Sequence, residues 1–152
     1  YAWQPAPGIR VFPDVVEVLT TLRDNGVQLG LITNSFHPSI LRDIELEALG
    51  LLHFFPKCRL TAADAGVLKP HSAIFLKALQ QLGIEASEAV YVGDNPVADV
   101  AGAQGAGMRA VLRVKSPPQP MLSGLIVPDA AVNTLHELLP VLDEWFAGWR
   151  SA

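Results

Sequence analysis

The chain has 152 residues, of which 50% are hydrophobic and 17% are charged, a composition typical of one globular domain with its own core. Its net charge is −4 with acidic and basic residues interspersed, which disfavours a nucleic-acid partner, and its apolar runs are too short for us to expect a membrane span. The single cysteine, Cys58, has no partner for an intrachain disulfide and suits a reducing compartment, so we expect a cytoplasmic protein.

Apolar residues recur at helical and strand periods along the chain, with glycine and proline between them. In chain order, the pattern predicts a helix at 14–25, a strand at 27–33, a helix at 39–49, a strand at 58–60, a helix at 71–82, a strand at 89–93, a helix from 96 and a strand at 109–114. Residues 115–124 hold three prolines and a glycine and are predicted to form a loop. This alternation predicts an α/β domain with a mainly parallel sheet.

A last helix is predicted after Thr134. Thr134 and Glu137 have the spacing of a capping box, in which each side chain would bond to the other residue's backbone N–H. Pro140 is expected to kink or divide this helix. The apolar side of the helix would carry Leu138, Leu142, Trp145 and Trp149.

Two carboxylates follow the strand at 89–93. Asp94 comes directly after Gly93, and Asp99 lies five residues later, within about the first turn of the next helix. Carboxylates near a helix N-terminus are favoured by its dipole, and Mg²⁺ is commonly held by one or two protein carboxylates with waters and phosphate. The pair is therefore a candidate magnesium site. The spacing alone fits two acids that only complement the helix start equally well.

Three further residues are candidates for binding phosphate. Thr33 and Asn34 end the predicted strand at 27–33, and ligands of parallel sheets bind beyond the carboxyl ends of the strands. Lys69 precedes Pro70, and the helix that follows could direct its ammonium inward. Each residue taken alone is better explained otherwise: Thr33 and Asn34 as polar strand-end residues, and Lys69 as a solvated loop lysine.

Taken together and in order, "LITNS", "GVLKPHSAIFLKAL" and "YVGDNPVADVAGAQGAGM" resemble motifs II, III and IV of the haloacid dehalogenase-like (HAD) hydrolase superfamily, in its phosphoglycolate-phosphatase-like branch. The resemblance covers roughly residues 11–142. It implies that Thr33 binds the transferring phosphoryl group, that Lys69 steadies nucleophile and phosphate, and that Asp94 and Asp99 bind Mg²⁺; Asn34 remains a candidate for phosphate binding from its place at the strand end. This form of motif IV is less usual among dehalogenases, so the resemblance favours a phosphatase.

Motif I of that superfamily, Asp-x-Asp-x-Thr at the end of the first strand, is not found: no two aspartates of this sequence are spaced by one residue. The resemblance assigns the nucleophile to the first aspartate and the general acid/base to the second. We therefore expect residues 1–152 to form an incomplete HAD-like core, a Rossmann-like three-layer αβα domain lacking its first strand and its substrate-selecting cap. The chain alone is expected to be inactive.

Three functional readings follow. The first is a magnesium-dependent phosphatase that acts on a small phosphate monoester through an aspartyl-phosphate in the intact protein. The second is a non-catalytic short form that serves as a binding or assembly module. The third is a receiver-type signalling domain, which the order Thr, Lys, Asp, Asp argues against.

The motif II and motif IV strands flank the missing strand in the family, so each would expose an unpaired edge here. Leaving several buried backbone groups unpaired costs roughly 1–3 kcal/mol each, and we expect the slot to be filled. Three outcomes are open: the two strands close up, residues 8–12 enter the slot, or a separate polypeptide supplies the strand. We favour the third, as a missing N-terminal segment or a strand from a second copy.

Overall fold

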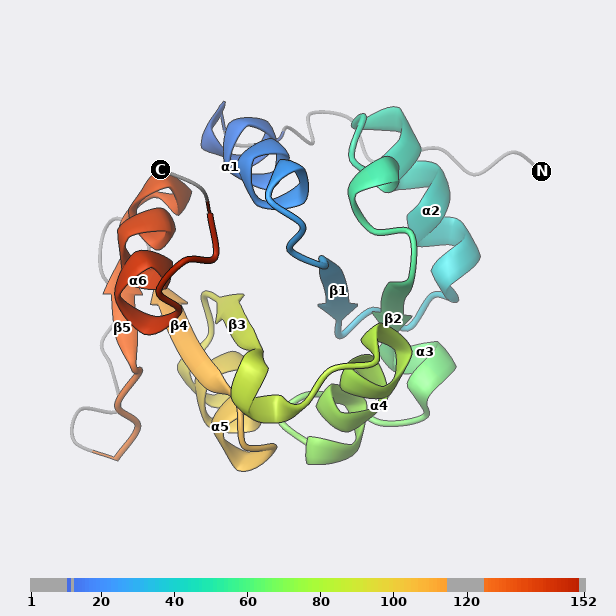
Figure 1. Ribbon diagram of the computed structural model, residues 1–152. Coiled ribbons are helices and arrows are strands. Elements are labelled where there is room, and N and C mark those ends of the chain that lie inside the picture. The colour runs from blue at the N-terminus through green and yellow to red at the C-terminus, as the bar shows by residue number, and fades with distance from the viewer. Residues whose placement is uncertain (1–10, 12, 115–124, 151–152) are drawn as a thin grey trace.

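The computed structural model describes residue 11 and residues 13–114 and 125–150. Helices and strands alternate along most of the chain, as predicted (Figure 1). The helices of four or more residues are α1 (Pro13–Asp24), α2 (Ser39–Ala48), α3 (Ala62–Ala65), α4 (Ser72–Leu82), the π-helix η3 (Pro96–Ala101), α5 (Gly102–Gly105) and α6 (Leu138–Trp145). Short 3₁₀ turns are η1 (Leu52–Phe54), η2 (Ala86–Glu88) and η4 (Leu135–Glu137).

The strands are β1 (Gly30–Thr33), β2 (Cys58–Thr61), β3 (Val90–Gly93), β4 (Arg109–Arg113) and β5 (Ala130–Val132). All pairings between them are parallel: β1 pairs with β2, and β3, β4 and β5 pair in that order. This confirms the predicted α/β class with parallel strands. The strands form two separate sheets, however, because no described strand pairs β1 with β3.

Helices cover the strands on two faces, through two hydrophobic clusters. One cluster joins α1, α2 and α6 to β4 and β5, through side chains such as Val18, Leu46 and Leu142. The other joins α4, η3 and α5 to strands of both sheets, through Phe75, Val100 and Ala103. The two sheets therefore lie between two helical layers, and side chains rather than strand pairing connect them.

A largely apolar cavity of about 820 Å³ lies between the two sheets. Its lining includes Leu31 and Ile32 of β1 and Val90 and Val92 of β3, so the facing edges of the two sheets border it. The strands have thus not closed up on each other, which removes the first of the three expected outcomes. Of residues 8–12, which could have entered the slot, the structure describes only Val11, and Val11 is in no strand. Supply of the strand by a separate polypeptide stays a prediction.

Helix α4 shows how local sequence sets the boundaries that matter for the site. His71 precedes it, and its Nδ1 accepts a hydrogen bond from the Ala73 N–H at 3.1 Å. Gly83 ends it in the left-handed conformation, with φ of +68°. Ile74 and Phe75 are fully buried on its inner face. The loop that carries Lys69 is therefore fixed directly before a well-packed helix.

Several predicted boundaries differ from the structure. Strand β1 begins at Gly30 rather than at 27, while α3 and β5 were not predicted. The predicted loop at 115–124 lies outside the described residues.

The capping box was wrong. The Thr134 side chain caps nothing, and the Glu137 carboxylate accepts from the Asn133 N–H at 2.9 Å, one residue earlier than predicted. The segment is a 3₁₀ turn, and Pro140 is the third residue of α6, within the first turn, where the N–H groups of a helix have no partner inside that helix.

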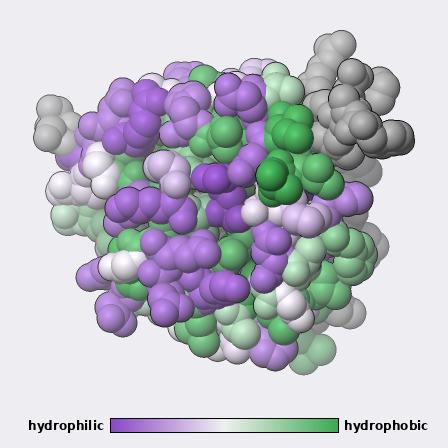
Figure 2. All heavy atoms as spheres, turned by 90° about the vertical axis from the view of Figure 1, so that its right-hand side faces the viewer, coloured by the Kyte–Doolittle hydropathy of each residue, from purple (hydrophilic) through white to green (hydrophobic). Residues whose placement is uncertain are grey.

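The outer surface is mixed in character. Figure 2 shows the face on the α2 and α3 side, where hydrophilic and hydrophobic side chains are interspersed. Ile40 and Ile44 of α2 are among the exposed apolar residues of the molecule. No helix in the described part of the chain has both the length and the apolar character needed to cross a membrane.

Candidate active site

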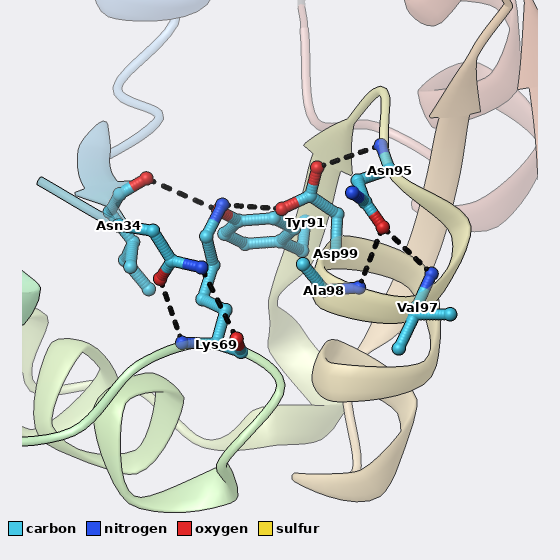
Figure 3. Close-up of polar contacts among 8 residues, drawn as sticks. Asn34, Lys69, Tyr91, Asn95, Val97, Ala98 and Asp99 are labelled. Atoms are coloured by element: carbon cyan, nitrogen blue, oxygen red, sulfur yellow. Dashed lines mark hydrogen bonds and ion pairs between the residues drawn. The ribbon is translucent and has the colours of Figure 1, made fainter.

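The loop that carries Lys69 is held against the end of β1 by Asn34. The Asn34 side-chain Oδ1 accepts a hydrogen bond from the Lys69 N–H at 2.8 Å, and its Nδ2 donates to the Lys69 carbonyl at 3.2 Å (Figure 3). One amide thus satisfies both backbone groups of a residue 35 positions away. Asn34, predicted as a phosphate-binding residue, therefore fixes the position of Lys69.

The ammonium of Lys69 points toward β3 and the helix that follows it. Its Nζ pairs with Oδ1 of Asp99 and donates a hydrogen bond to the Tyr91 hydroxyl at 3.1 Å. The Lys69 and Asp99 side chains are only 12% and 6% exposed, so the pair is largely removed from water. The structure thus brings together Lys69 and Asp99, which are thirty residues apart in the sequence.

Asp99 is oriented from its other side by the turn that follows β3. Its Oδ2 accepts a hydrogen bond from the Asn95 N–H at 3.0 Å. The Asn95 side chain in turn caps η3, since its Oδ1 accepts from the N–H groups of Val97 and Ala98 at 3.0 and 2.9 Å. Both carboxylate oxygens of Asp99 are therefore engaged within the protein.

The two acids predicted to share a metal ion have different surroundings. Asp94 is exposed, whereas Asp99 is 4% exposed and bound to Lys69 and Asn95. Asp94, Asp99 and Lys69 all line the cavity between the sheets. No group of three acidic, histidine or cysteine side chains suited to a metal occurs among the described residues. Asp94 and Asp99 both carry carboxylate oxygens of the kind that Mg²⁺ prefers, and Asp99 pairs with Lys69 in this structure.

Thr33 ends β1 with its hydroxyl buried. Its Oγ1 has no hydrogen-bond partner among the described residues. A buried hydroxyl without a partner carries a desolvation cost of roughly 1–3 kcal/mol. The neighbouring Asn34 is tied to Lys69, so this hydroxyl lies one residue from the contacts that fix the lysine.

Tyr91 was not predicted as a site residue. The sequence predicts an apolar strand at 89–93, and a tyrosine within such a strand has an apolar ring and a polar hydroxyl without indicating what the hydroxyl contacts. In the structure its hydroxyl contacts Lys69, and burial, with the charges of Asp99 and Asp94, raises the pKa of Tyr91 above its ordinary range. The phenol therefore stays protonated at neutral pH.

Comparison with known proteins places the chain in a family. The sequence profile of the haloacid dehalogenase-like hydrolases matches residues 6–107. The chain belongs to this family. The predicted superfamily is therefore confirmed, and so is the HAD-like α/β fold.

Relatives within the family include both phosphatases and a dehalogenase. A glyceraldehyde 3-phosphate phosphatase of Methanopyrus kandleri is 36% identical, over 90% of this chain and 58% of that protein. A HAD phosphatase from Thermococcus onnurineus has a TM-score of 0.77 at 36% identity, covering 87% of this chain and 58% of that chain. A 2-haloacid dehalogenase from Pseudomonas syringae pv. tomato also has a TM-score of 0.77, at 37% identity, covering 91% and 55%. The chain spans about half the length of the curated HAD relatives it matches.

Proposed function

We propose that this chain carries most of the active site of a magnesium-dependent HAD phosphatase that acts on a small phosphate monoester. The observation that carries the proposal is the placement of Lys69. Its ammonium is held by Asp99 and Tyr91, while its backbone is held by Asn34 next to the Thr33 hydroxyl. Thr33 ends β1 with an unpartnered hydroxyl, and Lys69 lies in the loop between α3 and α4 that Asn34 holds against this strand end. A hydroxyl and a cation so placed suit an anion such as a phosphoryl group.

Each residue has a role in this proposal. The Lys69 ammonium has three N–H donors, and Asp99 and Tyr91 accept two of them in the described contacts, so the third can be donated to a phosphoryl oxygen. The Thr33 hydroxyl donates to a second oxygen. Asp94 would hold Mg²⁺, which when bound supplies positive charge to the phosphoryl oxygens. Asp99 holds Lys69 in place, and its predicted binding of Mg²⁺ stays a prediction.

The nucleophile of the proposed reaction is an aspartate outside this sequence, because the 152 residues contain no Asp-x-Asp pair. Its carboxylate oxygen forms a bond to phosphorus as the bond to the substrate's ester oxygen breaks, and that oxygen leaves as the alcohol after taking a proton. Water then attacks the aspartyl-phosphate, which releases inorganic phosphate and restores the carboxylate. Lys69 and Thr33 stabilise the negative charge on the phosphoryl oxygens in both steps.

The cavity between β1 and β3 is the place for the segment that carries this aspartate. Both bordering strands are parallel members of their sheets and present facing edges without a described strand partner. A single extended strand between them would join the two sheets and would end beside Lys69. We propose that a missing N-terminal segment, or a strand from a second copy, occupies this slot.

The alternative function is a non-catalytic binding module that keeps the anion and metal residues without chemistry. The absence of an Asp-x-Asp pair from the sequence favours it. If the protein is a phosphatase, adding a strand that carries the aspartate should restore turnover; if it is a binding module, it should not. Both functions require the anion site, so a phosphate-binding experiment tests that site in either case.

The test is calorimetric titration of inorganic phosphate into the chain in the presence of Mg²⁺. We expect binding that weakens at least about tenfold in Lys69→Met, because a charge-assisted hydrogen bond is lost. Lys77→Met, which removes an exposed lysine of α4, is the matched control and should leave the affinity unchanged. Equal affinity in the two variants would contradict the proposed site.

A further inference from the structure

The Tyr91 hydroxyl connects three parts of the molecule that are distant in the sequence. It accepts a hydrogen bond from Lys69 Nζ at 3.1 Å and donates to the Ile32 carbonyl of β1 at 3.4 Å (Figure 3). Tyr91 itself belongs to β3, so the Ile32 contact runs from one sheet to the other. One hydroxyl therefore sets where the lysine lies relative to both strand ends.

The ring of Tyr91 is held as firmly as its hydroxyl. It packs edge-on against Phe75 of α4, with ring centroids 5.0 Å apart and an interplanar angle of 78°. The Lys69 Nζ also lies 5.5 Å from the centroid of the Tyr91 ring. Phe75 is fully buried, so the tyrosine has a rigid support beneath it.

We infer that Tyr91 is a positioning residue, which holds the Lys69 ammonium between Asp99 and the end of β1. The inference rests on the proposed function, in which the third N–H of that ammonium is donated to an anion. With Asp99 as its single partner, the Lys69 ammonium could still rotate about that contact, because its four-carbon side chain is flexible. A second fixed partner removes that freedom, so the remaining N–H keeps one direction.

The protonation state of Tyr91 agrees with this role. Burial and the nearby carboxylates raise the pKa of Tyr91, so the O–H is present to donate to Ile32. A hydroxyl that donates to a carbonyl still has lone pairs to accept from an ammonium. Tyr91 therefore contacts Lys69 and Ile32 as a neutral phenol.

The test compares Tyr91→Phe, which removes only the hydroxyl, with Ile74→Val. The second variant removes one methyl group from a fully buried residue of α4 and lowers stability without touching the lysine's polar contacts. Two measurements are made on each protein: the NMR signals of the Lys69 Cε methylene protons, assigned by their loss in Lys69→Met, and the affinity for inorganic phosphate with Mg²⁺.

We expect two separate Cε proton signals in the unsubstituted chain, because the ammonium is held in one orientation. Tyr91→Phe should merge them and weaken phosphate binding about tenfold, while Ile74→Val should leave both readouts unchanged. Separate signals and unchanged affinity in Tyr91→Phe would overturn the inference. Merged signals in Ile74→Val as well would overturn it too, since the effect would then follow stability. If no protein binds phosphate, the proposed function fails, and the methylene signals still decide whether Tyr91 holds Lys69.

Discussion

Gly93 lies directly against the carboxylate of Asp99. A Cβ atom at position 93 would come closer than 3.0 Å to the Asp99 side chain, a separation that real Cβ atoms do not tolerate. The same carboxylate binds Lys69 and the Asn95 N–H. The glycine at the end of β3 is thus required by the close approach of the Asp99 side chain.

We therefore expect Gly93→Ala to displace Asp99 and to lower the free energy of unfolding by about 1–3 kcal/mol, the usual cost of overpacking. Gly105→Ala is the matched control, because a Cβ there meets nothing within 4 Å and the backbone is helical. Urea denaturation measures both. A Gly93→Ala protein as stable as Gly105→Ala would contradict the packing described.

Magnesium binding is expected to depend on Asp94. Asp94→Asn replaces a charged oxygen ligand with a neutral one and should weaken Mg²⁺ binding by roughly tenfold or more, as measured by calorimetry. Asp24→Asn, at an exposed aspartate of α1, is the control for the change in net charge. Equal magnesium affinity in the two variants would show that the metal binds elsewhere.

The slot between the sheets is expected to accept an extended peptide. The four-residue edges of β1 and β3 are about 13 Å long, so a strand of four or five residues would span them. We would use a peptide with two lysines for solubility, five Val and Ile residues and a terminal Asp-x-Asp. Amide NMR signals of β1 and β3 should shift on binding, because both edges gain hydrogen bonds.

The control peptide carries proline at its central position, which removes an N–H donor and should abolish pairing. Shifts confined to β2 or β5 would mean that the peptide adds to an outer edge instead. The chain alone should not hydrolyse p-nitrophenyl phosphate with Mg²⁺, and the Asp-x-Asp peptide should restore turnover. Turnover by the chain alone that is lost in Asp94→Asn would place the nucleophile within these residues and refute the motif assignment.

Acid sensitivity is expected to arise in part from Asp14. Burial acts to raise its pKa, but the Leu135 N–H and the Arg113 guanidinium more than offset this, so the pKa of Asp14 lies below its usual 3.8. A carboxyl whose pKa is lowered on folding stabilises the protein above the unfolded pKa. That stability is lost as the pH falls below about 3.8 toward the folded pKa.

Asp14→Asn should therefore cost about 1–3 kcal/mol at pH 7 and progressively less below pH 4. Urea midpoints at pH 7 and pH 3 measure the difference, with Asp24→Asn as the exposed control on the same helix. A loss of stability that is the same at both pH values would show that the charge of Asp14 is not what stabilises the fold.

The helices and strands that carry the site residues could largely be predicted from the sequence, because their positions depend on local sequence patterns. Apolar runs that stop at Thr33 and at Gly93 mark strand ends, and parallel strands bring such ends to one edge. The helix at 72–82 was predictable from its periodicity and its terminal glycine. These patterns need no knowledge of which side chains meet across the fold.

The contacts within the site could not be predicted in this way, because they join residues distant in the chain. The spacing of Asp94 and Asp99 suggests two equivalent ligands, yet burial beside Lys69 gives Asp99 a different partner. The contact between the Tyr91 hydroxyl and Lys69 could not be predicted, because it depends on how close β3 lies to the loop that carries Lys69. The separation of the two sheets likewise depends on strand pairing, which apolar patterns do not encode.

Lys69 and Tyr91 also act as a mechanical link. Backbone hydrogen bonds between described strands end at the two sheet edges, so the contacts of Lys69 with Asn34 and Asp99, and of Tyr91 with Ile32, are polar connections across the divide. Substitutions of Lys69 or Tyr91 that are made to test the site would therefore also weaken the contacts between the two sheets. A Lys69 variant therefore reports how firmly the two sheets are held together as well as how well the anion site binds, and its unfolding curve should be measured together with its phosphate affinity.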